Sequence, residues 1–176
     1  MKTIYRMLPA LFVALVLAAA PQFAHAETVT AEDGSTYEKF NNWIGRCQPG
    51  PNEAKVCSVS VEIRSQETQA LALFFGIGKE PGKGYYLLNI VPLGTVLPNG
   101  VKLTIDGNEL ATLQLQTCLP RGCQSLSGVT AEGVQKLKSG NEMIVSIADI
   151  RQGPVALNVS LAGMTAAINW LDAQYP

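Results

Sequence analysis

The four cysteines are the residues whose spacing most directly predicts chemistry in this chain. They are Cys47, Cys57, Cys118 and Cys123, with nine residues between the first two and four between the last two. Each pair brackets proline and glycine, which form turns, so local pairing is favoured over the other connectivities. Zinc sites and redox dithiols favour closer CxxC spacing, which leaves metal or redox chemistry as the lesser alternative to two structural disulfides.

The single histidine, His25, falls in a segment that is typical of a secretory signal peptide, residues 1–26. Lys2 and Arg6 supply its positive start, an apolar run follows, and Ala-His-Ala forms the cleavage site. Cleavage there leaves no histidine, and 11 basic residues remain against 14 acidic ones, a net charge of −3. An uncleaved membrane anchor is disfavoured because a spanning helix needs roughly 20 apolar residues.

Most kinds of active site are absent from the sequence that remains. Without histidine there is no Ser-His-Asp triad, no Cys-His pair and no histidine-ligated zinc. The glycine-rich stretch 76–84 lacks the spacing of a phosphate loop and is expected to be a hairpin tip. Carboxylate pairs such as Glu62 and Glu67 fall where solvated charges are expected. We therefore expect a protein that is not an enzyme, with no cofactor and no metal.

Four other residues are candidates for binding a partner. Arg46 and Arg121 each lie within two residues of a cysteine, so disulfides would hold their loops in place. Tyr85 and Tyr86 could line a carbohydrate groove together with Phe74 and Phe75, although adjacent aromatic residues on apolar strands usually divide between core and surface, and the core is favoured for them. The weakly acidic charge balance argues against nucleic acid as the partner.

Strict alternation of apolar and polar residues predicts that β-strands must position these side chains. Turn-forming residues separate the alternating stretches, and Asp106-Gly107-Asn108 is typical of a hairpin. Two short helices are expected, one capped by Thr130 and one over 164–173. The expected strands are 57–64, 70–77, 85–91, 101–105, 112–116, 143–147 and 155–161.

These elements predict a mainly β fold, an antiparallel β-sandwich of the Ig-like or a related kind. There are no internal repeats and no linker, so residues 27–176 are expected to form a single domain. The polar stretch 27–36 is expected to be loose.

Several short motifs occur together in a fixed order along the chain. They include W-x-x-x-C at Trp43–Cys47, C-x-x-x-x-C at Cys118–Cys123 and S-L-x-G-M at Ser160–Met164. This order, from residue 40 to 171, resembles the invasion-associated locus B family of bacterial exported proteins. Met164 stands where the family usually has an aromatic residue, which is a substitution that a core can accept.

The resemblance implies a compact β-rich protein in the periplasm or attached to the outer membrane or cell surface. It implies no catalytic residues. Independently of the resemblance, no second apolar run of spanning length occurs, so no integral membrane segment is expected after cleavage. The resemblance also implies a role in virulence through host-cell invasion, which rests on particular pathogenic members. Binding of an envelope or host protein, in envelope maintenance or host contact, is the first expectation. The alternative is a module that binds a small ligand or glycan in a pocket between the sheets.

Overall fold

A computed structural model describes residues 29–50 and 54–175, and the predicted signal peptide lies outside them. This part of the chain forms twelve β-strands, two α-helices and a short 3₁₀ helix. Their bounds are β1 Val29–Thr30, β2 Thr36–Phe40, β3 Trp43–Pro49, β4 Lys55–Arg64, β5 Leu71–Glu80, β6 Gly84–Val91, η2 Leu97–Asn99, β7 Val101–Ile105, β8 Asn108–Leu113, β9 Thr117–Leu119, β10 Gly122–Val129, α1 Ala131–Ser139, β11 Glu142–Asp149, β12 Gly153–Ser160 and α2 Met164–Ala173.

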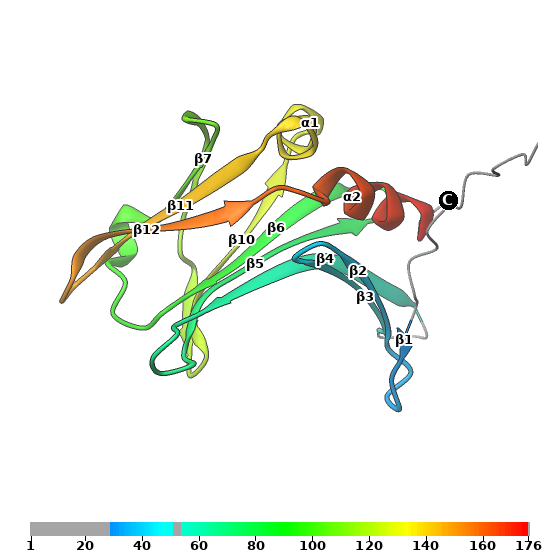
Figure 1. Ribbon diagram of the computed structural model, residues 1–176, viewed down its shortest axis with the longest axis horizontal. Coiled ribbons are helices and arrows are strands. Elements are labelled where there is room, and N and C mark those ends of the chain that lie inside the picture. The colour runs from blue at the N-terminus through cyan, green and yellow to red at the C-terminus, as the bar shows by residue number, and fades with distance from the viewer. Residues whose placement is uncertain (1–28, 51–53, 176) are drawn as a thin grey trace, which may run out of the picture.

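The strands form two antiparallel sheets, as the sequence predicted. The large sheet has the order β1-β2-β3-β4-β5-β6-β10-β9, and the small sheet has the order β12-β11-β7-β8. In Figure 1 the middle strands of the large sheet arch, and β11, β12 and α2 lie on the convex side of this arch. The core therefore fills the convex side, and the concave side faces outward.

Alternation along β4 shows how the sequence sets this arrangement. Cys57 and Val59 are fully buried on the convex side. Ser58 and Ser60, which alternate with them along the strand, point to the concave side. Strands β5 and β6 are apolar on both sides, and the side chains that point into the core include Phe75. Burial of these apolar side chains is the main contribution to the free energy of folding.

Both predicted helices are present. The Thr130 hydroxyl caps α1 by accepting the Gly133 N–H at 3.1 Å. Helix α2 packs on β3, where the Trp170 ring occupies the space that a side chain at Gly45 would need. The Asp106-Gly107 turn joins β7 to β8 with positive φ at both residues, as expected for this hairpin.

Both disulfides are also present with the predicted pairing. Cys47–Cys57 joins directly opposite residues of β3 and β4, with their Cα atoms 4.0 Å apart. Cys118–Cys123 does the same between β9 and β10, at 3.9 Å. Each disulfide therefore clips a hairpin.

The structure differs from the sequence prediction in several places. The stretch 27–36, expected to be loose, holds β1, which pairs with the start of β2, and Ser35 is only 1% exposed. Strand β8 ends at Leu113, so residues 114–116 are not in a strand. Strands β2, β3, β9 and β10 were not predicted. In β10 the serines hide the alternation, and one of them, Ser125, points into the core.

Candidate partner-binding face

The concave face of the large sheet is the strongest candidate for a binding site. Cross-strand register forms one row from Arg46 through Ser58 and Gly78 to Tyr86, because each of these residues lies opposite the next. The neighbouring row runs from Ile44 through Ser60 and Gly76 to Leu88 and Leu126. The middle of this face thus has a floor of small residues, with larger side chains on both sides.

Two aromatic rings lie over the glycines of this floor. A Cβ atom at Gly78 would overlap the ring of Tyr86, and one at Gly76 would lie 3.0 Å from Cε1 of Phe74. Glycine is therefore required at both positions for the rings to lie close against the sheet. Burial of Tyr86, with the nearby charges of Tyr175 and Glu80, raises the pKa of its hydroxyl. The hydroxyl therefore stays protonated and can donate a hydrogen bond.

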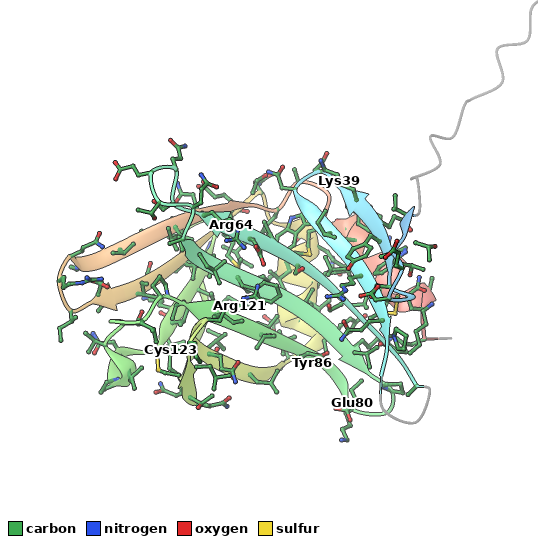
Figure 2. All side chains as sticks on the ribbon, turned by 90° about the horizontal axis from the view of Figure 1, so that it is seen from below. Lys39, Arg64, Glu80, Tyr86, Arg121 and Cys123 are labelled. Atoms are coloured by element: carbon green, nitrogen blue, oxygen red, sulfur yellow. A yellow bond between two sulfur atoms is a disulfide. The ribbon has the colours of Figure 1, made fainter. Side chains whose placement is uncertain are left out.

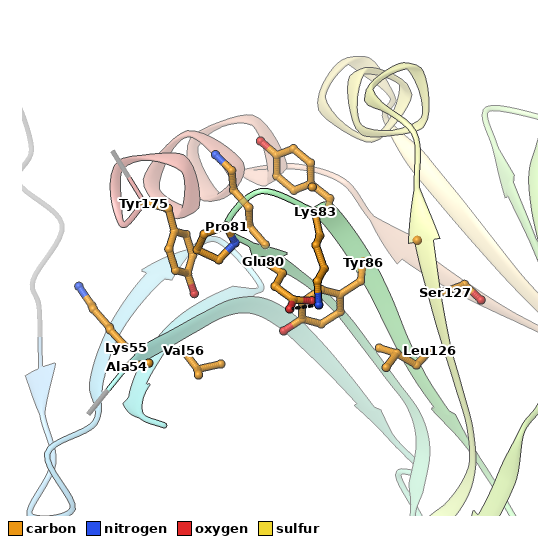
Figure 3. Close-up of a pocket in the computed structure, with 14 residues that line it drawn as sticks. Ala54, Lys55, Val56, Glu80, Pro81, Lys83, Tyr86, Leu126, Ser127 and Tyr175 are labelled. Carbon is orange, nitrogen blue, oxygen red and sulfur yellow. Dashed lines mark hydrogen bonds and ion pairs between the residues drawn. The ribbon is translucent and has the colours of Figure 1, made fainter. Parts of the chain in front are cut away.

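Two adjoining grooves hollow this face. The first, of about 670 Å³, includes Arg46, Phe74 and Arg121 in its lining. The second, of about 730 Å³, includes Tyr86 and Leu126. Val56 lines both grooves, so they meet at this side chain. Figure 2 shows Arg121 and Tyr86 on this face, and Figure 3 shows Tyr86 and Leu126 beneath the arch of the strands.

Arg46 is fixed by contacts on several sides. Its guanidinium lies 5.4 Å from the centre of the Tyr37 ring. Its Nη2 donates to the Ser35 hydroxyl at 3.1 Å and pairs with Asp33 at 3.4 Å. The Nε atom is buried and has no hydrogen-bond partner within the described part of the chain. An oxygen acceptor from a ligand would satisfy this donor.

Arg121 is held at the opposite side of the first groove. It lies in the turn that the Cys118–Cys123 disulfide closes, and its guanidinium is 5.4 Å from the centre of the Phe74 ring. Its Nη2 pairs with Glu62 at 2.7 Å, and Glu62 also pairs with Arg64 at 2.7 Å. The cluster of two arginines and one carboxylate keeps an excess positive charge beside the groove.

Tyr85 has a different place from the other three predicted residues. Its hydroxyl hydrogen-bonds to Asp172 of α2, and Lys79 pairs with the same carboxylate at 2.9 Å. Burial and the contact with Asp172 raise the pKa of Tyr85 to about 12. Burial opposes the charge on Asp172, but the hydrogen bonds from Tyr85 and Lys79 outweigh it and lower the pKa of that carboxyl. Tyr85 therefore anchors α2, and it also lines part of the second groove.

The structure thus brings Arg46, Arg121 and Tyr86 to one face and separates Tyr85 from them. Sequence analysis named Phe74 with the tyrosines as a possible groove residue, although it favoured the core, and it missed Leu126 as a member of this face. The signal that could have found Leu126 and favoured Phe74 is the Gly-x-Gly spacing in β5 opposite the Ser-x-Ser spacing in β4, because small residues on neighbouring strands leave room for large ones beside them.

Residues 29–50 and 54–175 lack two kinds of feature. They contain no group of three or more His, Cys, Asp or Glu residues arranged to hold a metal ion. Among the helices of this same part of the chain, none is long and apolar enough to cross a membrane.

These observations define the class of protein. It is a β-sandwich with two hairpins closed by disulfides and an open concave face that is bordered by arginines. The family model described as "Invasion associated locus B (IalB) protein" matches residues 43–172. The chain therefore belongs to the invasion-associated locus B family.

Individual relatives agree with this assignment. Invasion protein B homologues of Brucella abortus strain 2308 and of biovar 1 strain 9-941 are each 28% identical over 151 residues, covering 85% of this chain and 87% of theirs. The crystal structure of invasion associated protein b from Bartonella henselae is 21% identical, with a TM-score of 0.68. That match covers 78% of this chain and 95% of the Bartonella chain and shows a shared fold.

Proposed function

We propose that this chain is a non-enzymatic exported protein that binds a macromolecular partner through its concave face. The observation that carries the proposal is that Arg46 and Arg121, each stacked on an aromatic ring, border the same groove. Side chains held in place before binding lose less conformational entropy when a partner arrives. The exposed Leu126 and the ring of Tyr86 extend the same face with apolar area that a partner could bury.

Export is part of the same proposal. Disulfides persist in oxidising compartments such as the periplasm, and both disulfides here close hairpins of the fold. Removal of residues 1–26 would release the domain into the periplasm, where the outer membrane or the cell surface would be within reach. The role in invasion that the family name carries is proposed only for a host-associated bacterium.

A site-specific photo-crosslinking experiment tests the concave face. A photoreactive amino acid replaces Leu126, which is 51% exposed on this face. The matched control replaces Ile150, which is 76% exposed at the turn between β11 and β12. Adducts formed in living cells are compared between the periplasmic and outer-membrane fractions.

We expect a discrete protein adduct at position 126 and none at position 150. The double variant Arg46→Gln/Arg121→Gln should lose the adduct while it keeps the melting temperature of the parent to within a few degrees. Equal adducts at both positions, or an adduct that the arginine variants leave unchanged, would overturn the proposal. An adduct with glycan alone would instead support the small-ligand or glycan alternative.

A further inference from the structure

Strand β12 is an edge strand whose free side can be worked out from the hydrogen bonds around it. It is the outer strand of the small sheet and pairs with β11 alone. In an antiparallel pair, the backbone groups of alternate residues point toward the partner strand and those between point away. Leu161 N–H donates to Asn141 C=O at 2.9 Å, which extends the pairing of the two strands by one bonded pair. The residues of β12 whose backbone N–H and C=O groups point away from β11 are therefore Pro154, Ala156, Asn158 and Ser160, although Pro154 has no N–H.

Two hydrogen bonds on the other side of β11 support this assignment of outward-pointing residues. The C=O groups of Glu142 and Ala148 accept bonds from Asp106 and Val96, so both point away from β12. These residues lie opposite Ser160 and Pro154 in the register.

The two ends of this free edge are closed, and its middle is open. Ser160 C=O accepts the indole N–H of Trp43 at 3.0 Å, and Pro154 has no N–H to offer. Between them, the outward N–H and C=O groups of Ala156 and Asn158 have no hydrogen-bond partner among the described residues. Proteins usually protect such edges with proline, charged side chains, bulges or a covering segment. Here two residues are left with four unpaired backbone groups.

The space beside this edge is hollow along the length of the strand. One hollow of about 510 Å³ lies between Val155 and Leu157 on β12 and Leu71 on β5. Another of about 350 Å³ lies between Val159 and Ile63 on β4. The side chains of Val155, Leu157 and Ile63 are only partly buried there. We call these two hollows, with the free edge of β12, the seam.

We propose that the seam binds an extended peptide segment of a partner protein, which adds to β12 as a further strand. A polypeptide strand is the ligand that presents N–H and C=O groups at the spacing of Ala156 and Asn158. Its alternate side chains would enter the two hollows and meet apolar residues, so those side chains are apolar.

The charged residues around the seam indicate which net charge the bound segment should have. The seam carries both signs at each end, with Lys39 and Glu62 near Val159, and Arg151 beside Glu67 and Asp149 near Val155. A strongly acidic or strongly basic segment would gain little from this mixture. The seam therefore suits a segment of low net charge, unlike the arginine-bordered concave face.

Binding of a designed peptide tests the seam. The probe is a fluorescent octapeptide of alternating valine and threonine, flanked by lysines for solubility, and its binding to the chain without residues 1–26 is followed by anisotropy. The control peptide has the same side chains but is N-methylated at alternate residues, which removes the donors that face β12. In ¹⁵N spectra of the protein, the amide signals of Ala156 and Asn158 should shift with the first peptide only.

A pair of protein variants gives the matched control. Ala156→Pro removes an N–H that makes no hydrogen bond to β11. Pro154 already occupies an equivalent position on the same strand, so the variant should fold. Ala156→Ser keeps this N–H. We expect Ala156→Pro to weaken binding about tenfold through the lost hydrogen bond and the added ring, and Ala156→Ser to bind like the parent.

Four results would overturn the proposal. They are no binding at about 1 mM peptide, equal binding of the N-methylated peptide, amide shifts confined to the concave face, and dimers of the chain that Ala156→Pro dissociates. The last result would show that a second copy pairs with β12. The N-methylated peptide keeps the test valid even if Ala156→Pro fails to fold.

Discussion

The two disulfides are expected to differ in how much each stabilises the fold. Cys47–Cys57 joins residues 10 apart in the chain, and Cys118–Cys123 joins residues 5 apart. In the chain-entropy model, loops of these lengths correspond to about 2.7 and about 2.1 kcal/mol of stabilisation. Loop length alone therefore separates the two disulfides by only about 0.6 kcal/mol.

Burial separates them further. Cys47 and Cys57 are 2% and 0% exposed, and the hydroxyl of Tyr175, beyond α2, accepts the backbone N–H of Cys57 at 2.7 Å. Cys118 is exposed, although Cys123 is buried. Removal of each buried sulfur adds about 1 kcal/mol, on the scale of a buried methylene. Replacing both cysteines with alanine should thus cost about 4–5 kcal/mol at the first disulfide and about 3 kcal/mol at the second.

Urea unfolding followed by tryptophan fluorescence measures these free energies for the two double-alanine variants. Under native conditions with a mild reductant, mass spectrometry of alkylated thiols should find Cys118 and Cys123 modified before Cys47 and Cys57. Equal losses in the two variants, or earlier reduction of the buried disulfide, would refute the reasoning that burial adds to the difference that loop length sets between them.

Three further changes have expected effects on stability. Gly45→Ala places a Cβ 2.7 Å from Cζ3 of Trp170 and should cost about 1–3 kcal/mol in urea unfolding. The cost should largely vanish in a Trp170→Ala background, and an unchanged cost there would contradict the clash. Thr130→Ala removes the cap of α1 and should cost about 1 kcal/mol in thermal melts, whereas Thr130→Ser should cost much less. The backbone N–H groups of Glu142 and Asn141 lower the pKa of Asp106 in the folded protein. The stability that this carboxylate adds is therefore complete above the ordinary pKa of aspartate. It is lost as the pH falls through the lower pKa of the folded state. The stability gap between the parent and Asp106→Asn should therefore shrink in acid, and urea midpoints that keep a constant gap from neutral to acidic pH would argue against this role.

Local patterns in the sequence determined much of the fold. Alternation of apolar and polar residues predicted the strands around Val59 and Val145, because each half-buried strand must place one set of side chains in the core. Turn residues and a helix cap marked the hairpin at Asp106 and the start of α1. The short cysteine spacings predicted both disulfides, since each spans one hairpin.

Strand β10 shows where these patterns fail. Ser125 on β10 lies opposite Asn89 on β6, and both are fully buried. Neither side chain has a hydrogen-bond partner within the described residues. Polar residues on the core side erase the alternation, so sequence reasoning assigned no strand there.

Only the tertiary structure decided which residues form the candidate sites. Arg121 meets Glu62, 59 residues away in the chain, and the row from Arg46 to Tyr86 crosses four strands. Alternation along one strand fixes which residues share a side, but it fixes neither the register between strands nor the curvature of the sheet. Those depend on how the small sheet and α2 pack on the convex side. The same packing turns Tyr85 toward α2, opens the concave face and leaves one edge of β12 without a partner, because each is a property of the assembled sheets and not of any single segment.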